Sequence, residues 1–219
     1  MPVKIGLQHI DIWNESLEKQ VQEYEAEPIQ KGQIVFYGPS NFTRWKREKW
    51  DHTPLSEVIV GKSGAKCAIN RGFGSSCPEH QLYYYPRMVR PLEPKVLVYS
   101  CTNGNGKIFG YTPEESFELA QRVVAYAMAD FPDIRVYLVG TQRRREMTEE
   151  NLAERRAYNA MVRAFAENTP NCFYVDALEY EPLQRTDIYV KDGVHYNQEG
   201  YDIYGEFFKE ILKDELEKF

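Results

Sequence analysis

Long apolar runs are missing from this chain of 219 residues. No window approaches the roughly 18 consecutive apolar residues that a membrane-spanning helix needs, so we expect no membrane insertion. The opening segment, MPVKIGLQHIDIW, has neither a long apolar region nor a small-residue cleavage site. It therefore lacks the features of a secretory signal, and we expect a cytoplasmic protein.

Cysteine is scarce and has no metal-like spacing. The four cysteines are Cys67, Cys77, Cys101 and Cys172, and no two of them form a CxxC pair. Zinc-binding motifs and disulfide frameworks are thereby disfavoured, and unpaired thiols are the simplest interpretation.

An excess of positive charge is also missing. The chain has 27 Lys and Arg against 33 Asp and Glu, which gives a net charge of -6. Such a protein gains no electrostatic help in binding nucleic acid or an anionic membrane, so we expect neither as a partner. The only basic run, Arg143 to Arg145, is followed closely by Glu146, Glu149 and Glu150, and we interpret it as a solvated loop rather than a phosphate site.

Repeats, low-complexity tracts and Gly/Ser linkers are absent, which predicts one continuous domain over 1–219. Short apolar runs alternate with amphipathic windows, a pattern typical of a parallel sheet with helices on both faces. The sequence predicts strands at 33–37, 66–70, 95–99, 135–139 and 172–175. It predicts helices at 13–24, 78–85, 112–129, 148–167 and 198–216, with Pro86 ending the second. The expected fold is α/β with a doubly wound five-stranded sheet, and 1–32 is a lead-in helical segment packed on it.

Ligands of doubly wound sheets bind beyond the carboxyl ends of the strands. Ser40 follows the first strand, the turn with Gly74 and Ser75 follows the second, and Asn103 and Asn105 follow the third. A serine that opens a helix is often only its N-cap. Glycine turns and Asn amides can donate to an anion, but both are also common in ordinary turns.

Asp192 and His195 lie in the loop before the last helix. A serine that transfers acyl groups needs a base, and histidine is suited to this near neutral pH. A carboxylate three residues earlier in a loop can reach Nδ1 and fix the tautomer of the ring. For the other histidines, His9, His52 and His80, we expect structural or solvent-exposed roles.

Four segments carry a resemblance to the SGNH/GDSL hydrolases: IVFYGPSNFTRW, INRGFGSS, PKVLVYSCTNG and KDGVHYNQEGY. The chain looks most like the bacterial branch of this family, in which the first block reads G-x-S. The resemblance implies a three-layer α/β/α sandwich of the flavodoxin-like type. It also implies hydrolysis of lysophospholipids, simple acyl esters or acetylated carbohydrates, with no metal and no organic cofactor.

The resemblance also implies roles for particular residues. Ser40 would be the nucleophile, with Asp192 and His195 as its base system. The oxyanion hole would use the backbone N–H of Ser40, a backbone N–H in the second block at Gly74 or Ser75, and the amide of Asn103. Counting back from Thr112-Pro113 would choose Asn105 in place of Asn103.

The family pattern is altered at Pro39, Ser75 and Gly104, where Asp or Ser, Gly and Asp are usual. We predict a serine ester hydrolase that acts on a small acyl ester or an acetylated carbohydrate. The altered positions motivate an alternative, a catalytically weakened ligand-binding protein with the same fold. A nucleotide-binding protein is a third reading, but no complete GxGxxG or P-loop follows the first strand. Acyl length and oligomeric state are not fixed by the sequence.

Overall fold

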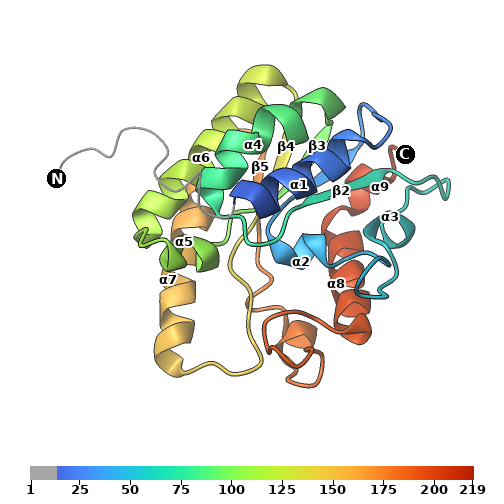
Figure 1. Ribbon diagram of the computed structural model, residues 1–219. Coiled ribbons are helices and arrows are strands. Elements are labelled where there is room, and N and C mark those ends of the chain that lie inside the picture. The colour runs from blue at the N-terminus through green and yellow to red at the C-terminus, as the bar shows by residue number, and fades with distance from the viewer. Residues whose placement is uncertain (1–13) are drawn as a thin grey trace.

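The computed structural model describes residues 14–219, and its centre is a parallel sheet of five strands in the order β2-β1-β3-β4-β5 (Figure 1). The strands are β1 (Ile34–Gly38), β2 (Ala68–Gly72), β3 (Val96–Ser100), β4 (Arg135–Val139) and β5 (Cys172–Val175). Each lies within two residues of its predicted position. The predicted doubly wound five-stranded sheet is therefore confirmed.

Helices cover both faces of the sheet. They are α1 (Asn14–Glu25), α2 (Ser40–Thr43), α3 (Leu55–Val58), α4 (Pro78–Met88), α5 (Gly104–Ile108), α6 (Pro113–Asp130), α7 (Glu149–Glu167), α8 (Gln198–Ile211) and α9 (Lys213–Leu216). Two 3₁₀ turns lie at Arg90–Leu92 and Glu181–Gln184.

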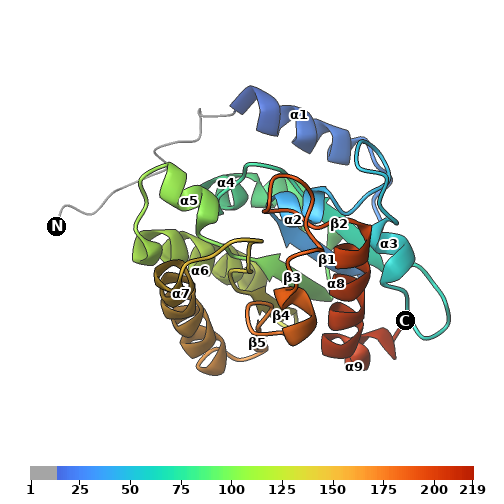
Figure 2. The same ribbon diagram turned by 90° about the horizontal axis from the view of Figure 1, so that it is seen from below.

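Successive side chains of a strand point to opposite faces, and two apolar cores follow from this. On β1, Val35 and Tyr37 enter one core together with side chains from α1, α4, α6 and α7. Ile34 and Phe36 enter the other core, which α2, α3, α8 and α9 cover. Seen from below, α7 and α8 lie on opposite sides of the sheet (Figure 2). The protein is thus a three-layer α/β/α sandwich.

Helix α1 packs against the first core. Leu17, Val21 and Tyr24 of α1 are buried, and the Tyr24 hydroxyl donates a 2.6 Å hydrogen bond to the carbonyl of Gly72 at the end of β2. The predicted apolar position Trp13, like His9, lies outside the described residues.

Threonine side chains cap the starts of two helices. Thr112 accepts a hydrogen bond from the backbone N–H of Glu115, whose carboxylate reaches back to the N–H of Thr112. Thr148 caps α7 in the same manner, by accepting from the N–H of Asn151.

The predicted ends of two helices are wrong. Pro86 does not end α4, which continues to Met88 because a proline in the last turn removes only one backbone hydrogen bond. The N–H of Val89 still donates to the carbonyl of Tyr85 across it. The predicted helix at 198–216 is interrupted at Leu212, and Leu212 and Leu216 both belong to the second core.

Within residues 14–219, no helix combines the length and the apolar character that crossing a membrane requires. The four cysteines are all buried and unpaired, as predicted.

Candidate active site

The first three strands of the chain end side by side, and this brings the loops after them together. Gly38 pairs with Gly72, and Tyr37 pairs with Tyr99. At Gly38, with φ of +157°, an added Cβ would lie 2.7 Å from the Cβ of Ser100, so only glycine lets β1 end this close to β3. An added Cβ at Gly72 would lie 2.4 Å from the backbone nitrogen of Thr43 in α2. The helix that begins with Ser40 therefore rests directly on the end of β2.

Ser40, His195 and Asp192 form a continuous hydrogen-bonded chain. The Ser40 Oγ lies 2.7 Å from His195 Nε2, and His195 Nδ1 lies 2.8 Å from Asp192 Oδ2. An ionised carboxylate can only accept hydrogen bonds, so Nδ1 carries the proton of the neutral ring. Nε2 is then free to accept from the serine hydroxyl, which is the tautomer that a general base requires.

Asp192 is fixed by its own loop. Its Oδ1 accepts hydrogen bonds from the backbone N–H groups of Val194 (2.9 Å) and His195 (3.0 Å). Burial by itself raises the pKa of Asp192, but these N–H groups and the imidazole outweigh it and hold the pKa well below the ordinary value. The group is therefore a carboxylate at every pH at which the protein is expected to work.

His195 is shielded from solvent, with 9% of its surface exposed. Burial lowers the pKa of the imidazole, and the hydrogen bond to Asp192 opposes this effect. The positive charges of Arg44 and Arg144 lower the pKa further. The ring is consequently neutral near pH 7 and available to take a proton.

Arg44 connects the helix of Ser40 to Asp192. Its Nη1 donates to Asp192 Oδ2 over 3.0 Å, the same oxygen that accepts from His195. Arg44 is the residue just after α2, so its side chain spans from the serine segment to the loop of the last block.

The loop that carries Asp192 and His195 is anchored by the basic run. Arg145 Nη2 donates to the carbonyls of Tyr189 (2.8 Å) and Val190 (2.6 Å), and Arg143 Nε donates to that of Leu178 (3.2 Å). The interpretation of this run as a solvated loop is thus wrong for Arg143 and Arg145, because folding brings backbone carbonyls from distant segments within their reach. Arg144 is exposed.

A polar network supports Asn41, the residue after Ser40. The side-chain amide of Asn41 donates to Gln142 Oε1, and Gln142 Nε2 donates to the hydroxyl of Tyr204. The Tyr201 hydroxyl donates to the carbonyl of Asn41 over 2.9 Å. Helix α8 therefore fixes the backbone beside Ser40.

The predicted oxyanion donors fall into two groups. The N–H of Gly74 donates to Gln20 Oε1 (2.7 Å), and the amide of Asn105 donates to the carbonyl of Ser76 (2.8 Å), so these donors are already engaged. The backbone N–H groups of Ser40 and Ser75 and the side-chain amide of Asn103 form no hydrogen bond with any residue of 14–219.

Ser75 adopts a left-handed conformation, with φ of +68°, at a position where the family usually has glycine. The conformation of the turn is thus kept although the side chain differs.

A small cavity of about 60 Å³ opens at Ser40. It is lined by Pro39, Ser40, Asn41, Thr102, Gly104, Asn105, Gln142, Arg143, Arg144, Arg155 and Val194. Asn103 lines an adjoining cavity of about 160 Å³, which shares Gly104, Arg144 and Arg155 with the first. A larger cavity of about 710 Å³ lies between α1 and β2 and contains none of the predicted site residues.

The other described histidines have structural positions. His80 is buried, and its Nδ1 accepts from the backbone N–H of Cys77 at the start of α4 (3.1 Å). His52 packs on the ring of Tyr201 with centroids 4.7 Å apart. Among residues 14–219, His, Cys, Asp and Glu side chains nowhere gather in a group of three that would suit a metal ion.

Reasoning from the sequence did not single out Arg44, Gln20, Gln142 or Arg155. Arg44 lies four residues after Ser40, one helical turn on and inside the first block, and this spacing was an available signal. The other three reach the site from α1, from the loop after β4 and from α7, and no local spacing indicates this.

A doubly wound sheet with these loops at its carboxyl edge places the chain among three-layer α/β/α proteins. Residues 37–203 match the model of the GDSL-like lipase/acylhydrolase family, so the chain belongs to this family and is a carboxylic ester hydrolase. A comparison with curated proteins finds no match.

Solved structures of similar fold include a GDSL-like lipase from Bacteroides thetaiotaomicron, with 21% identity, a TM-score of 0.69, and coverage of 91% of this chain and 98% of that one. A psychrotrophic esterase from Pseudoalteromonas shares 12% identity at a TM-score of 0.67, with 85% and 99% covered. A lipase/acylhydrolase from Enterococcus faecalis shares 19% identity at a TM-score of 0.64, with 84% and 96% covered. At these identities the likeness concerns the fold.

Proposed function

We propose that Ser40, His195 and Asp192 are the catalytic triad of this ester hydrolase, and that its substrate is a small acyl ester or an acetylated carbohydrate. The observation that carries the proposal is the unbroken hydrogen-bonded chain from Ser40 Oγ through the imidazole to Asp192. The membership of the chain in an acylhydrolase family supports it.

In the first half of the reaction, His195 Nε2 takes the proton from the Ser40 hydroxyl while Oγ attacks the carbonyl carbon of the ester. The ring then carries two protons, and the Asp192 carboxylate stabilises its charge. The tetrahedral intermediate collapses as the bond to the alcohol oxygen breaks. His195 gives its new proton to that oxygen, so the alcohol leaves neutral and the acyl group stays on Ser40.

In the second half, a water molecule replaces the alcohol. His195 takes a proton from the water, the hydroxide attacks the acyl carbon, and Ser40 Oγ leaves and recovers its proton from the ring. The acid is released and the enzyme returns to its starting state.

The developing oxyanion needs donors that are not already engaged. The N–H groups of Ser40 and Ser75 and the amide of Asn103 meet this condition, and we assign the oxyanion hole to them. The amides of Gly74 and Asn105 are committed to Gln20 and Ser76, and we assign these two residues to positioning the turn and the α5 segment.

The cavity at Ser40 favours a small acyl group. Its volume of about 60 Å³ is small beside the adjoining cavity of about 160 Å³, so a short acyl group such as acetyl suits it best. A medium-length acyl chain would have to extend out of this cavity.

The test is an assay of p-nitrophenyl acetate and p-nitrophenyl octanoate with wild type, Ser40→Ala and His195→Ala. We expect the acetate to be preferred and both variants to lose about 10³-fold or more in kcat. Asp192→Ala is expected to lose less than His195→Ala, because the ring can still accept a proton. Ser63→Ala, which removes an exposed serine, is the matched control and should keep wild-type activity.

Equal turnover by wild type and Ser40→Ala would overturn the proposal. If folded wild type shows no turnover, labelling with a fluorophosphonate reagent distinguishes a hydrolase from the ligand-binding alternative. Labelling of Ser40 in wild type, and its loss in His195→Ala, would support a hydrolase with a narrow substrate range. An unlabelled Ser40 would indicate the weakened, ligand-binding alternative.

A further inference from the structure

Positive charge is concentrated at the cavity of the proposed nucleophile. Arg143, Arg144 and Arg155 line the same cavity of about 60 Å³ as Ser40, and no Asp or Glu is among its lining residues. The whole chain has a net charge of -6, so this cluster runs against the charge of the molecule. Arg144 is exposed and Arg155 is half-buried, and a charge that is withdrawn from water without a counter-ion is costly unless an anion joins it.

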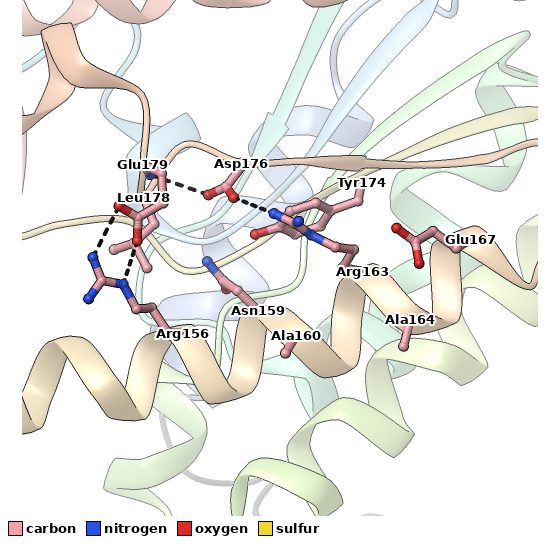
Figure 3. A pocket seen from close by; sticks show the side chains of 10 residues that line it. All are labelled: Arg156, Asn159, Ala160, Arg163, Ala164, Glu167, Tyr174, Asp176, Leu178 and Glu179. Carbon is pink, nitrogen blue, oxygen red and sulfur yellow. Dashed lines mark hydrogen bonds and ion pairs between the residues drawn. The ribbon is translucent and has the colours of Figure 1, made fainter.

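Most arginines elsewhere in the protein face a carboxylate. The groove between α7 and the segment after β5, with a cavity of about 290 Å³, shows the usual arrangement (Figure 3). There Arg156 pairs with Glu179 at 2.7 Å, and Arg163 pairs with Asp176 at 2.8 Å. Both arginines of that groove are already paired.

Arg144 and Arg155 differ from these residues. Within residues 14–219, neither has a carboxylate oxygen within 4.0 Å of its guanidinium nitrogens. Arg155 donates one hydrogen bond, from Nη1 to the carbonyl of Gln142 over 2.6 Å. The side chain of Arg144 donates none to the described residues, and its Nη2 lies 3.8 Å from where a Cβ on Gly104 would be.

The charge of Arg144 adds to the electrostatic cost of burying Arg155. Burial lowers the pKa of Arg155 to about 10, and the charge of Arg144 contributes to this lowering. Glu154 acts in the opposite direction but is paired with Lys107 at 2.9 Å. Glu154 and Glu146 line the adjoining cavity and not the cavity of Ser40.

We propose that the ester cleaved at Ser40 carries an anionic group, a carboxylate or a phosphate, and that Arg144 and Arg155 bind it. The proposal rests on the proposed function of Ser40. A guanidinium presents a planar fork of N–H donors that matches the paired oxygens of either anion. The two arginines line both the cavity of Ser40 and the adjoining one. An ester with its carbonyl at Ser40 therefore places a charged group a few bonds away against them.

The experiment compares esters that differ in one charged group. Monomethyl succinate against methyl butyrate places a carboxylate in the acyl part. Acetoxyacetate against propyl acetate places it in the alcohol part, and 2-acetoxyethyl phosphate replaces that carboxylate by phosphate. Release of acid is followed by titration at constant pH. The preferred pair identifies the part of the substrate that carries the charge.

We expect wild type to favour the anionic member of at least one pair by about 10- to 100-fold in kcat/KM, which is the range of a charge-assisted hydrogen bond. Arg144→Gln and Arg155→Gln should lower this ratio about ten-fold or more, chiefly through KM, and Arg144→Lys should restore part of it. Arg156→Gln is the control and should leave the ratio unchanged, because Arg156 pairs with Glu179 in the other groove and does not line the cavity of Ser40. Equal kcat/KM for both members of every pair, or a ratio that survives in both Gln variants, would overturn the proposal.

Binding to Ser40→Ala separates this proposal from that of the triad. Calorimetry should show monomethyl succinate, acetoxyacetate or 2-acetoxyethyl phosphate binding about ten-fold or more tighter than its neutral partner, and Arg144→Gln should remove the difference. Anion-selective binding without turnover by wild type would support the arginine site and count against the triad. Turnover that depends on Ser40 but shows no charge preference in rate or binding would support the triad and count against the arginine site.

Discussion

The side chain of Arg44 contacts the proposed triad through Asp192, and replacing Arg44 therefore tests how its charge affects the proposed base. Its positive charge lowers the pKa of His195, so Arg44→Gln should raise that pKa. Because His195 must be neutral to act, the acidic limb of the pH profile of kcat/KM should move to higher pH. The shift is measured from kcat/KM for p-nitrophenyl acetate hydrolysis between about pH 4 and 8.

Arg47→Gln is the matched control for this change. Arg47 lies three residues further along and pairs with Glu57 at 3.1 Å, without contact to Asp192. The acidic limb of the Arg47→Gln profile should coincide with that of wild type. An unmoved limb in Arg44→Gln, or a shift to lower pH, would mean that Arg44 does not act electrostatically on the ring.

The two asparagines after β3 should respond differently to substitution. Asn103→Ala removes an unengaged donor and should lower kcat by about 10²–10³ with little change in KM. Asn105→Ala removes the hydrogen bond to Ser76 and should cost about 1 kcal/mol of folding free energy, with a smaller loss of kcat. Steady-state kinetics and urea unfolding of both variants measure the two effects. If Asn105→Ala has the larger kcat defect, the assignment of the donor must be exchanged.

At the scale of single residues, the sequence was sufficient to predict contacts between residues of one short motif. Asp192 and His195 are three residues apart in a loop, so their contact depends mainly on local geometry. The contact of His195 with Ser40 spans 155 positions, and it was indicated by the expected meeting of the strand ends and by the family resemblance. Arg155 could not be found in this way, because its position at the cavity depends on how α7 is rotated against the sheet.

At the scale of elements, the position of α2 depends on the absence of a side chain in β2. A Cβ at Gly72 would lie 2.4 Å from the nitrogen of Thr43 and 2.6 Å from the carbonyl carbon of Phe42, and backbone cannot move aside cheaply. Gly72→Ala should therefore cost about 1–3 kcal/mol of folding free energy and displace Ser40. The urea midpoint of unfolding and kcat, measured on the same samples, should both be lower than in wild type.

Gly104→Ala is the control for this substitution, because an added Cβ there would meet only the Arg144 guanidinium at 3.8 Å. Its unfolding midpoint should stay close to that of wild type. Wild-type stability and kcat in Gly72→Ala would show that α2 does not depend on this close approach.

The prediction of elements succeeded where the local pattern matched the packing. β3 is buried on both faces, and this is the burial that its continuous apolar sequence predicts. The ends of α4 and α8 were missed because they depend on tertiary contacts. Tyr85 and Met88, on either side of Pro86, are both buried in the first core. Leu212, where the last helix is interrupted, is buried in the second core.

At the scale of the whole molecule, we propose that residues 1–219 form a single domain that unfolds as one unit. The two apolar cores are not independent, because every strand separates them and supplies both. Leu97 and Val98 are neighbours on β3, yet Leu97 is buried in one core and Val98 in the other. Unfolding of either core would strip one face of every strand and expose the apolar residues behind it.

This arrangement predicts that damage to either core destabilises the whole protein. Leu97→Ala should cost on the order of 2–5 kcal/mol, and Val98→Ala somewhat less, because each leaves a cavity in a fully buried layer. In each variant, urea unfolding followed by far-ultraviolet circular dichroism and by tryptophan fluorescence should give one coincident transition. Trp45 is buried in the second core only, so Leu97→Ala is the stringent case. If its fluorescence transition stays at the wild-type midpoint while its dichroism transition moves, the cores unfold separately and the sheet does not couple them.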